Sequence, residues 1–276
     1  MLALLFASFL SEAAPVVHAA TPSLDCVSAC PNTTAGVSSG KITLTVTLTT
    51  ASAAPLVIAV VSEGDTKAGR STINTPTDNA ASMNSLCAES STIPGIAVYY
   101  FVGSSTSNKV IATISTTGTG VHGALIAFGV SGYATSGTFD ISCPAAVTGT
   151  GTSPSATLSG LTNGNDFVFA GVASKTDTVK TSAPSTEISN TGTKIAAMGT
   201  AAAYQLGNGA GSYTLAFSTT SSSAKWIEVV AAVNDSSPTP VPLFPSGAAP
   251  LLLAIPVVYI LLRRPASHKG EPGARK

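Results

Sequence analysis

Short apolar segments, separated by turns rich in glycine, serine and asparagine, recur from residue 41 to residue 233. Within residues 41–49, apolar residues alternate strictly with lysine and threonine, as in a strand that buries one face. Other segments are apolar at almost every position, which is typical of strands covered on both faces. Strands of these two kinds predict an all-β sandwich. We expect about ten to eleven strands, at 41–49, 55–62, 96–103, 109–116, 123–131, 138–142, 156–161, 166–174, 199–206, 211–219 and 225–233.

The expected strands fall into two halves of similar pattern. Four pairs of segments match at offsets of 103 to 111 residues: 56–62 with 167–173, 100–103 with 204–207, 115–117 with 218–220, and 127–130 with 230–233. Half-repeats over 41–142 and 156–234 would explain this order, and each half would then need the other to cover its apolar face. The alternative is that strands rich in alanine, valine, serine and threonine align through composition alone. The combined pattern resembles Ig-like or jelly-roll-like modules of surface proteins, which implies a sandwich.

Residues 1–20 are typical of a secretory signal peptide. Leu2 to Leu10 form an apolar run that is too short to span a bilayer, and Val17-His18-Ala19 fits a signal-peptidase site. Cleavage there places the mature chain outside the cell. A buried N-terminal helix is the alternative interpretation.

Residues 243–262 contain no charged residue over a length that spans a bilayer as a helix. Arg263 and Arg264 follow directly, and basic residues beside a membrane span favour the cytoplasmic side. We therefore expect the protein at the outer face of the cell membrane. The expected parts are an irregular segment over 21–40, an extracellular β-sandwich over 41–234, a Pro/Ser/Thr linker over 235–242 and a basic cytoplasmic tail over 263–276.

The C-terminal region resembles a known class of sorting signal. A proline-interrupted hydrophobic segment lies between two short motifs, formed by Pro242, Leu243, Phe244 and Pro245 before it and by Arg263 and Arg264 after it. This arrangement is similar to the PEP-CTERM and PEF-CTERM signals, and the segment looks like those of archaeal surface proteins. The resemblance implies recognition by an exosortase or archaeosortase, a membrane transpeptidase that cuts near the motif and attaches a lipid. Leu243 stands where such signals commonly have glutamate, so the segment is either removed or kept as a permanent anchor.

Four cysteines, Cys26, Cys30, Cys87 and Cys143, lie in the part that we expect outside the membrane, where disulfides persist. They allow three pairings, and spacing does not choose among them. A metal site on Cys26 and Cys30 is the alternative, although no second pair of Cys or His follows at a suitable spacing. Asn32 and Asn234 begin glycosylation sequons near the two ends of the body.

Residues that could carry catalysis are few. His122 is the one histidine of the body, so a Ser-His-Asp triad would need it. Residues 36–40 match G-x-S-x-G and residues 118–123 match G-x-G-x-x-G, but an expected strand follows each motif where the corresponding sites need a helix. Glu63, Asp65 and Asp78 are candidate calcium ligands without EF-hand spacing. We therefore expect no catalytic residue, no metal and no cofactor.

The charge balance excludes one class of partner. Residues 21–240 carry eight Lys and Arg against eleven Asp and Glu, so a concentrated basic face for nucleic acid is missing. The sequence favours a non-catalytic structural or adhesion protein of the envelope or matrix. Its expected partners are the membrane, a sorting transpeptidase, and surface glycans or other envelope proteins. The alternatives are a carbohydrate-binding module that uses Tyr100 and Trp226 for stacking, and a secreted hydrolase.

Overall fold

The computed structural model describes residues 21–37, 40–64, 71–87, 94–117, 120–144, 146–175, 177–191 and 198–236. Over these ranges the chain forms nineteen strands and no helix, and every strand pair is antiparallel. The predicted all-β class is therefore confirmed. Each of the predicted strands is present, with bounds that differ by at most two residues.

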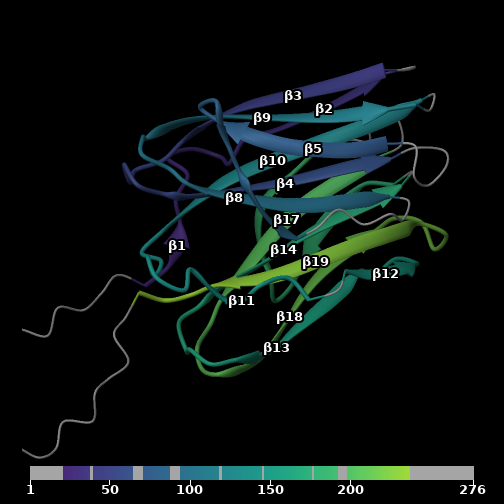
Figure 1. Ribbon diagram of the computed structural model, residues 1–276. Coiled ribbons are helices and arrows are strands. Elements are labelled where there is room, and N and C mark those ends of the chain that lie inside the picture. Colours follow the sequence, from purple (N-terminus) through teal and green to yellow (C-terminus); the bar gives the residue numbers. More distant parts are fainter. Residues whose placement is uncertain are drawn as a thin grey trace, which may run out of the picture. The chain divides into compact units, whose positions relative to one another are not determined.

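Two six-stranded sheets form the inner layers of the body (Figure 1). The first inner sheet has the order β1-β10-β4-β8-β7, and β2 also pairs with β10. Its strands are β1 (Ser23–Leu24), β2 (Asn32–Val37), β4 (Leu56–Gly64), β7 (Asn84–Cys87), β8 (Gly95–Val102) and β10 (Val121–Ser131). The second inner sheet has the order β11-β19-β14-β17-β16, and β12 also pairs with β19. Its strands are β11 (Phe139–Ile141), β12 (Val147–Thr150), β14 (Phe167–Lys175), β16 (Thr186–Asn190), β17 (Met198–Leu206) and β19 (Lys225–Val233).

Two smaller sheets cover the inner pair from outside. The first outer sheet has the order β3-β9-β5-β6, and the second has the order β13-β18-β15. The strands of the first are β3 (Gly40–Thr49), β5 (Ser71–Asp78), β6 (Ala81–Ser82) and β9 (Ser107–Thr116). The strands of the second are β13 (Ser155–Leu161), β15 (Val179–Ser182) and β18 (Gly211–Thr219).

Three apolar cores separate the four sheets. The central core joins the two inner sheets and contains Phe128 of β10 with Phe167 and Phe169 of β14. A second core lies between the first inner and first outer sheets, and a third between the second inner and second outer sheets. The sheets therefore stack in the order outer, inner, inner, outer, and each inner sheet is covered on both faces.

This layering explains the two sequence patterns. Every residue of β4 is buried, and β14 is buried at all positions except Lys175, because apolar layers lie above and below both strands. Strand β3 has one face on a core and one in solvent, so its residues from Ile42 onward alternate between buried and exposed. A strand that is buried on both faces must be apolar at almost every position. A strand that is buried on one face needs apolar residues only at every second position.

The number of strands exceeds the predicted ten to eleven. The strands that the sequence pattern missed are short or polar and lie mainly at sheet edges: β1, β2, β5, β6, β7, β12, β15 and β16. Residues 21–40, which we expected to be irregular, contain β1 and β2, both paired with β10. Such strands are held by backbone hydrogen bonds and need few apolar side chains, so hydrophobic periodicity does not reveal them.

The two halves of the chain share one strand order. The inner order β10-β4-β8-β7 corresponds to β19-β14-β17-β16, and the outer order β3-β9-β5 corresponds to β13-β18-β15. Strands β1 and β2 flank β10 as β11 and β12 flank β19. The repeated unit therefore begins at β1 and β11, earlier than the expected starts at residues 41 and 156, and β11 belongs with the second half. Common descent of the halves by duplication would account for this order.

The four cysteines form two disulfides, Cys26–Cys30 and Cys87–Cys143. The first closes a loop between β1 and β2 over a separation of 4 residues. The second joins the end of β7 in the first half to the chain after β11 in the second half, over a separation of 56 residues. All four side chains lie in or against the central core.

Loss of the long-range disulfide is expected to destabilise the fold more than loss of the short one. In the chain-entropy account, closing the longer loop contributes about 4 kcal/mol and closing the shorter one about 2 kcal/mol. Urea denaturation of Cys87→Ala/Cys143→Ala and of Cys26→Ala/Cys30→Ala measures both losses, and the second variant is the matched control. Equal losses, or a larger loss for the Cys26/Cys30 pair, would contradict a stabilising link between the halves.

Candidate interaction surfaces

The first outer sheet presents a face rich in hydroxyl groups. On β3 the side chains of Lys41, Thr43, Thr45, Thr47 and Thr49 are exposed, because they alternate with the buried apolar positions. No side-chain hydrogen bond ties the four threonines to the residues that the structure describes. Their hydroxyl groups can therefore both donate and accept hydrogen bonds towards solvent or a partner.

The second outer sheet repeats this chemistry. Ser155, Thr157 and Ser159 of β13 are exposed, as are Ser212 and Thr214 of the adjacent β18. The hydroxyl oxygens of Thr157 and Thr214 lie 2.7 Å apart across the two strands. Both outer faces are therefore polar but carry few charges.

Two carboxylates hold equivalent loops in the two halves. Asp25 accepts hydrogen bonds from the backbone N–H groups of Ala51 (2.6 Å) and Ser52 (3.1 Å), after β3. Asp140 accepts from the N–H of Thr162 (2.7 Å) and from its hydroxyl (2.6 Å), after β13. Burial alone would raise the pKa of Asp140, but the hydrogen bonds to Thr162 outweigh it and hold the pKa below its usual value. Both carboxylates therefore have a structural role.

Asp177 fixes the loop between β18 and β19 in the same manner. Its carboxylate accepts from the N–H of Thr178 (2.8 Å), the N–H of Ser221 (2.5 Å) and the hydroxyl of Thr220. Burial acts to raise the pKa of Asp177, but the hydrogen bonds, led by that of Thr220, lower it overall. A carboxylate with several donors in a closed turn is a poor candidate for proton transfer.

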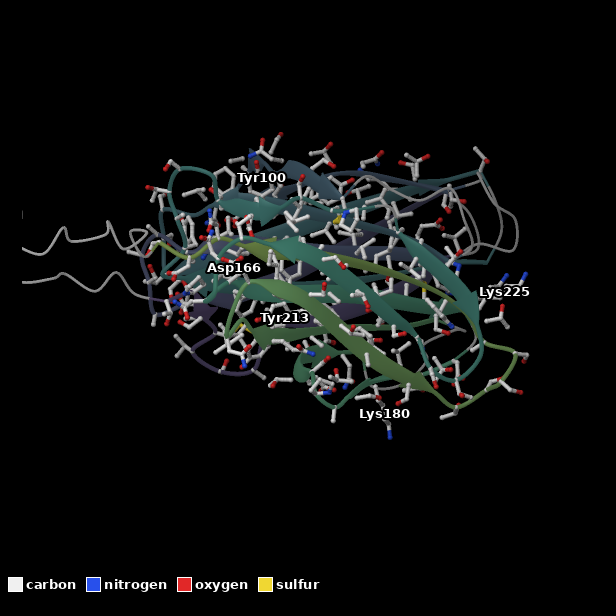
Figure 2. All side chains as sticks on the ribbon, turned by 90° about the horizontal axis from the view of Figure 1, so that it is seen from below. Tyr100, Asp166, Lys180, Tyr213 and Lys225 are labelled. Carbon is white, nitrogen blue, oxygen red and sulfur yellow. A yellow bond between two sulfur atoms is a disulfide. The ribbon has the colours of Figure 1, made fainter. Side chains whose placement is uncertain are left out.

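Asp166 and Asp235 lie with Asp140 at one end of the body, where Figure 2 labels Asp166. The Asp166 side chain is fully buried, and its Oδ1 accepts from the N–H of Asp235 at 3.1 Å. Burial raises the pKa of Asp166 to about 7; the Asp235 N–H opposes this, whereas the nearby Asp140 carboxylate adds to it. Burial therefore favours the protonated form of this carboxyl group well above the pH at which an exposed aspartate ionises.

Glu228 is the most unusual carboxyl group of the body. It lies in β19 with no exposed surface, it faces the core of the second half, and neither carboxyl oxygen has a hydrogen-bond partner among the described residues. Burial raises its pKa to about 8, and the backbone N–H of Ala156 opposes this without reaching hydrogen-bonding geometry. By the strand registers, Leu125 occupies the corresponding place in the first half. Glu228 lies within the strand expected at 225–233, but the sequence pattern did not predict its burial.

The candidate calcium ligands are not brought together. Glu63 accepts a hydrogen bond from the hydroxyl of Ser71 at the start of β5, whereas Asp78 ends that strand. Seven residues of strand correspond to about 23 Å. Asp78 is buried, and burial raises its pKa, while Asp65 lies outside the described residues. The described residues contain no group of three or more His, Cys, Asp and Glu side chains suited to a metal ion.

His122 lies on β10 against the backbone of β2. A Cβ atom added to Gly36 would lie 2.4 Å from His122 Nδ1, so the ring rests directly on this glycine. Nδ1 is buried and has no hydrogen-bond partner among the described residues, and burial lowers the pKa of His122. Gly36 and Gly40 belong to the strands β2 and β3, and Gly123 lies within β10, so neither glycine motif precedes a helix.

The two aromatic residues proposed for glycan stacking lie far apart. Tyr100 packs edge-on against Phe139, with ring centroids 4.9 Å apart, at the end of β19 that carries Val233. Trp226 lies near the opposite end of β19 and covers Gly149, whose added Cβ would lie 2.3 Å from the indole ring. Seven residues along a strand separate these ends by about 23 Å. The two side chains therefore cannot form one shared platform.

Both sequon asparagines make hydrogen bonds within the fold. Asn32 Nδ2 donates to the Ser189 hydroxyl (2.8 Å) and to the carbonyl oxygen of Asn190 (3.0 Å), which connects the two halves. Asn234 Nδ2 donates to the carbonyl oxygen of Gly137 at 3.0 Å. A glycan replaces one hydrogen of Nδ2, so glycosylation of Asn32 would remove one of its two bonds.

The predicted signal peptide and sorting segment, including Pro242 to Pro245, Arg263 and Arg264, lie outside the described residues. The part of the chain that the structure covers contains no helix long and apolar enough to cross a membrane.

Replacing Glu228 by Gln is expected to make the protein more stable at neutral and basic pH. A raised folded-state pKa means that the folded protein binds the proton more tightly than the unfolded chain, so stability falls as pH rises from 4.5 towards 8. The accumulated loss by pH 7 is about 3 kcal/mol. Glu228→Gln removes this pH-dependent loss of stability. The raised pKa of Asp166 also lowers stability as pH rises, and that loss remains in the variant.

Urea denaturation between pH 5 and pH 9 measures the effect on the free energy of unfolding. The exposed Glu187 provides the matched control, since Glu187→Gln should leave the pH profile unchanged. Glu228→Leu, which restores the residue of the first half, should stabilise further by removing a buried polar group. A wild-type profile that rises between pH 5 and pH 8 would refute the assignment.

Comparisons with known protein families, with curated proteins and with solved structures find no match for this chain. Any statement about function therefore rests on the residues and geometry described above.

Proposed function

We propose that this chain is a non-catalytic structural or adhesion protein, displayed on the outer face of the cell and anchored through its C-terminal region. The observation that carries the proposal is the state of the cysteines. All four are in disulfides, and one of these links the two halves across the central core. Such bonds form and persist in secreted proteins and are rare in the reducing cytosol. An exported body agrees with the signal peptide expected over residues 1–20.

The two ends of the described body lie at the same end of the sheets, which supports attachment to the membrane from one side. Ser23 pairs with Ser131, and Tyr133 forms a bridge to Asp235, so the first and last described strands meet at one end of the sheets (Figure 1). A linker over 235–242 would continue from this end. Lys225 is labelled at the opposite end in Figure 2. The distal loops and both outer faces would then be free for contacts.

The surface chemistry supports display rather than catalysis. The outer faces carry serine and threonine hydroxyl groups, which form many weak and similar hydrogen bonds. Several anchored copies would add such contacts through their shared attachment, so that modest single-site affinity suffices. Surface glycans and other envelope proteins are the partners that fit this chemistry.

Removal of residues 243–276 tests the anchoring. We expect the full chain to fractionate with the cell envelope and the truncated chain to appear in the medium. The matched control lacks residues 265–276 alone and keeps Arg263 and Arg264, so it should stay with the envelope. Intact mass of the envelope form then separates a retained helix from cleavage near Pro242 with an added lipid. A full chain that stays in the cytosol with Met1 and reduced cysteines would overturn the proposal.

A further inference from the structure

Strand β3 leaves one row of backbone groups facing away from its sheet. Thr50 N–H donates to the carbonyl oxygen of Thr106 at 2.9 Å, next to the ladder pair Thr49 and Ser107. Hydrogen-bonded pairs alternate along an antiparallel ladder, so the even-numbered residues of β3 bond to β9. The N–H and C=O groups of Lys41, Thr43, Thr45 and Thr47 therefore point to the open edge.

The hydrogen bond at Thr49, the last residue of β3, confirms that the backbone groups of the odd-numbered residues point away from β9. Val27 N–H donates to the carbonyl oxygen of Thr49 at 2.9 Å, from the side opposite β9. The described residues supply no such partner to Lys41, Thr43, Thr45 or Thr47, since β3 pairs with β9 alone. In Figure 1, β3 forms the rim of its sheet. A row of unpaired donors and acceptors is a template for another strand.

Most of the other sheet edges carry features that obstruct such pairing; β2, which has six residues and a regular register with β10, is the exception. β13, which corresponds to β3, is interrupted by a bulge at Gly160, whose φ is 86°. β5, β7, β11 and β16 each have a register shift, and β1, β6, β12 and β15 have four residues or fewer. β3 has ten residues, a regular register and no proline. Bulges and short strands protect natural sheet edges, and β3 lacks both.

We propose that β3 pairs antiparallel with β3 of a second copy of this chain, about a two-fold axis at Leu44. Thr43 then lies opposite Thr45 of the second copy, and Lys41 lies opposite its Thr47. This register uses the four residues whose outward backbone groups have no partner among the described residues, and it avoids Thr49, whose carbonyl is already occupied. It forms about eight hydrogen bonds between the copies.

The side chains agree with this register. No like charges face each other across the axis, because the lysine at position 41 meets a threonine, and threonine pairs favour adjacent strands. On the buried face Leu44 meets Leu44 of the second copy, and Ile42 meets Val46. The first outer sheets would thus join into one sheet with a continuous apolar underside. A two-fold contact of this kind closes on itself and stops at the dimer. The pairing is independent of the proposed location on the cell.

Thr45→Pro in the full chain tests the pairing in detergent solution by sedimentation. The substitution removes an N–H that faces the open edge and leaves the ladder with β9 intact, so the fold should persist. We expect the wild type to sediment as a dimer and Thr45→Pro to dissociate at least about tenfold more readily. Thr157→Pro, at the corresponding edge position of β13, is the matched control and should remain dimeric. A monomeric wild type, or a dimer unaffected by Thr45→Pro, would overturn the proposal.

Two charge variants test the register without touching the backbone. Thr43 and Thr45 are exposed, so lysine or glutamate there should leave the fold unchanged. Thr43→Lys/Thr45→Glu places opposite charges across the axis and should retain the dimer. Thr43→Lys/Thr45→Lys places like charges there and should weaken it, with recovery at high salt. Equal association of the two double variants would exclude pairing about Leu44.

Discussion

The rest of the structure depends on the face-to-face packing of the two inner sheets. Phe128 of the first half lies 5.5 Å from Phe169 and 6.5 Å from Phe167 of the second half, measured between ring centroids. An added Cβ on Gly171 would lie 2.7 Å from Val60, so the Val60 side chain packs directly on the backbone of β14 where that strand has no side chain. Each large apolar side chain buried there contributes about 1.5–3 kcal/mol. Neither inner sheet could keep this face in water, so we expect the two halves to unfold as one cooperative unit.

Several carboxylates lie at strand ends, outside this central packing. The carboxylates of Asp25, Asp140 and Asp177 fix loops at strand ends, where backbone N–H groups would otherwise lack acceptors. Glu228 departs from this arrangement, because it occupies a core position and keeps its proton up to about pH 8. The stability of the fold therefore declines as the pH rises towards 8. The outer faces and the β3 edge remain polar and open, and the proposed contacts use them.

Strands with long apolar or strictly alternating runs could be predicted from the sequence, and strands that are short or mostly polar could not. Residues 56–62 and 167–173 are apolar at almost every position because two layers cover β4 and β14. β2 is rich in Asn and Thr and is set by pairing with β10, a strand far along the chain. Local sequence patterns also failed to predict the geometry of the candidate sites. Cysteine pairing and the separation of Tyr100 from Trp226 follow from the stacking of the sheets, which no local pattern encodes.

Native-state hydrogen exchange tests the dependence of each half on the other most directly. If the two inner sheets stabilise each other, the slowest amides of β4 and β14 should exchange with the same free energy, equal to that of global unfolding. Urea should lower both in parallel. Exchange of one of these strands at a clearly lower free energy, while the other stays protected, would show that the halves unfold separately and would contradict the account.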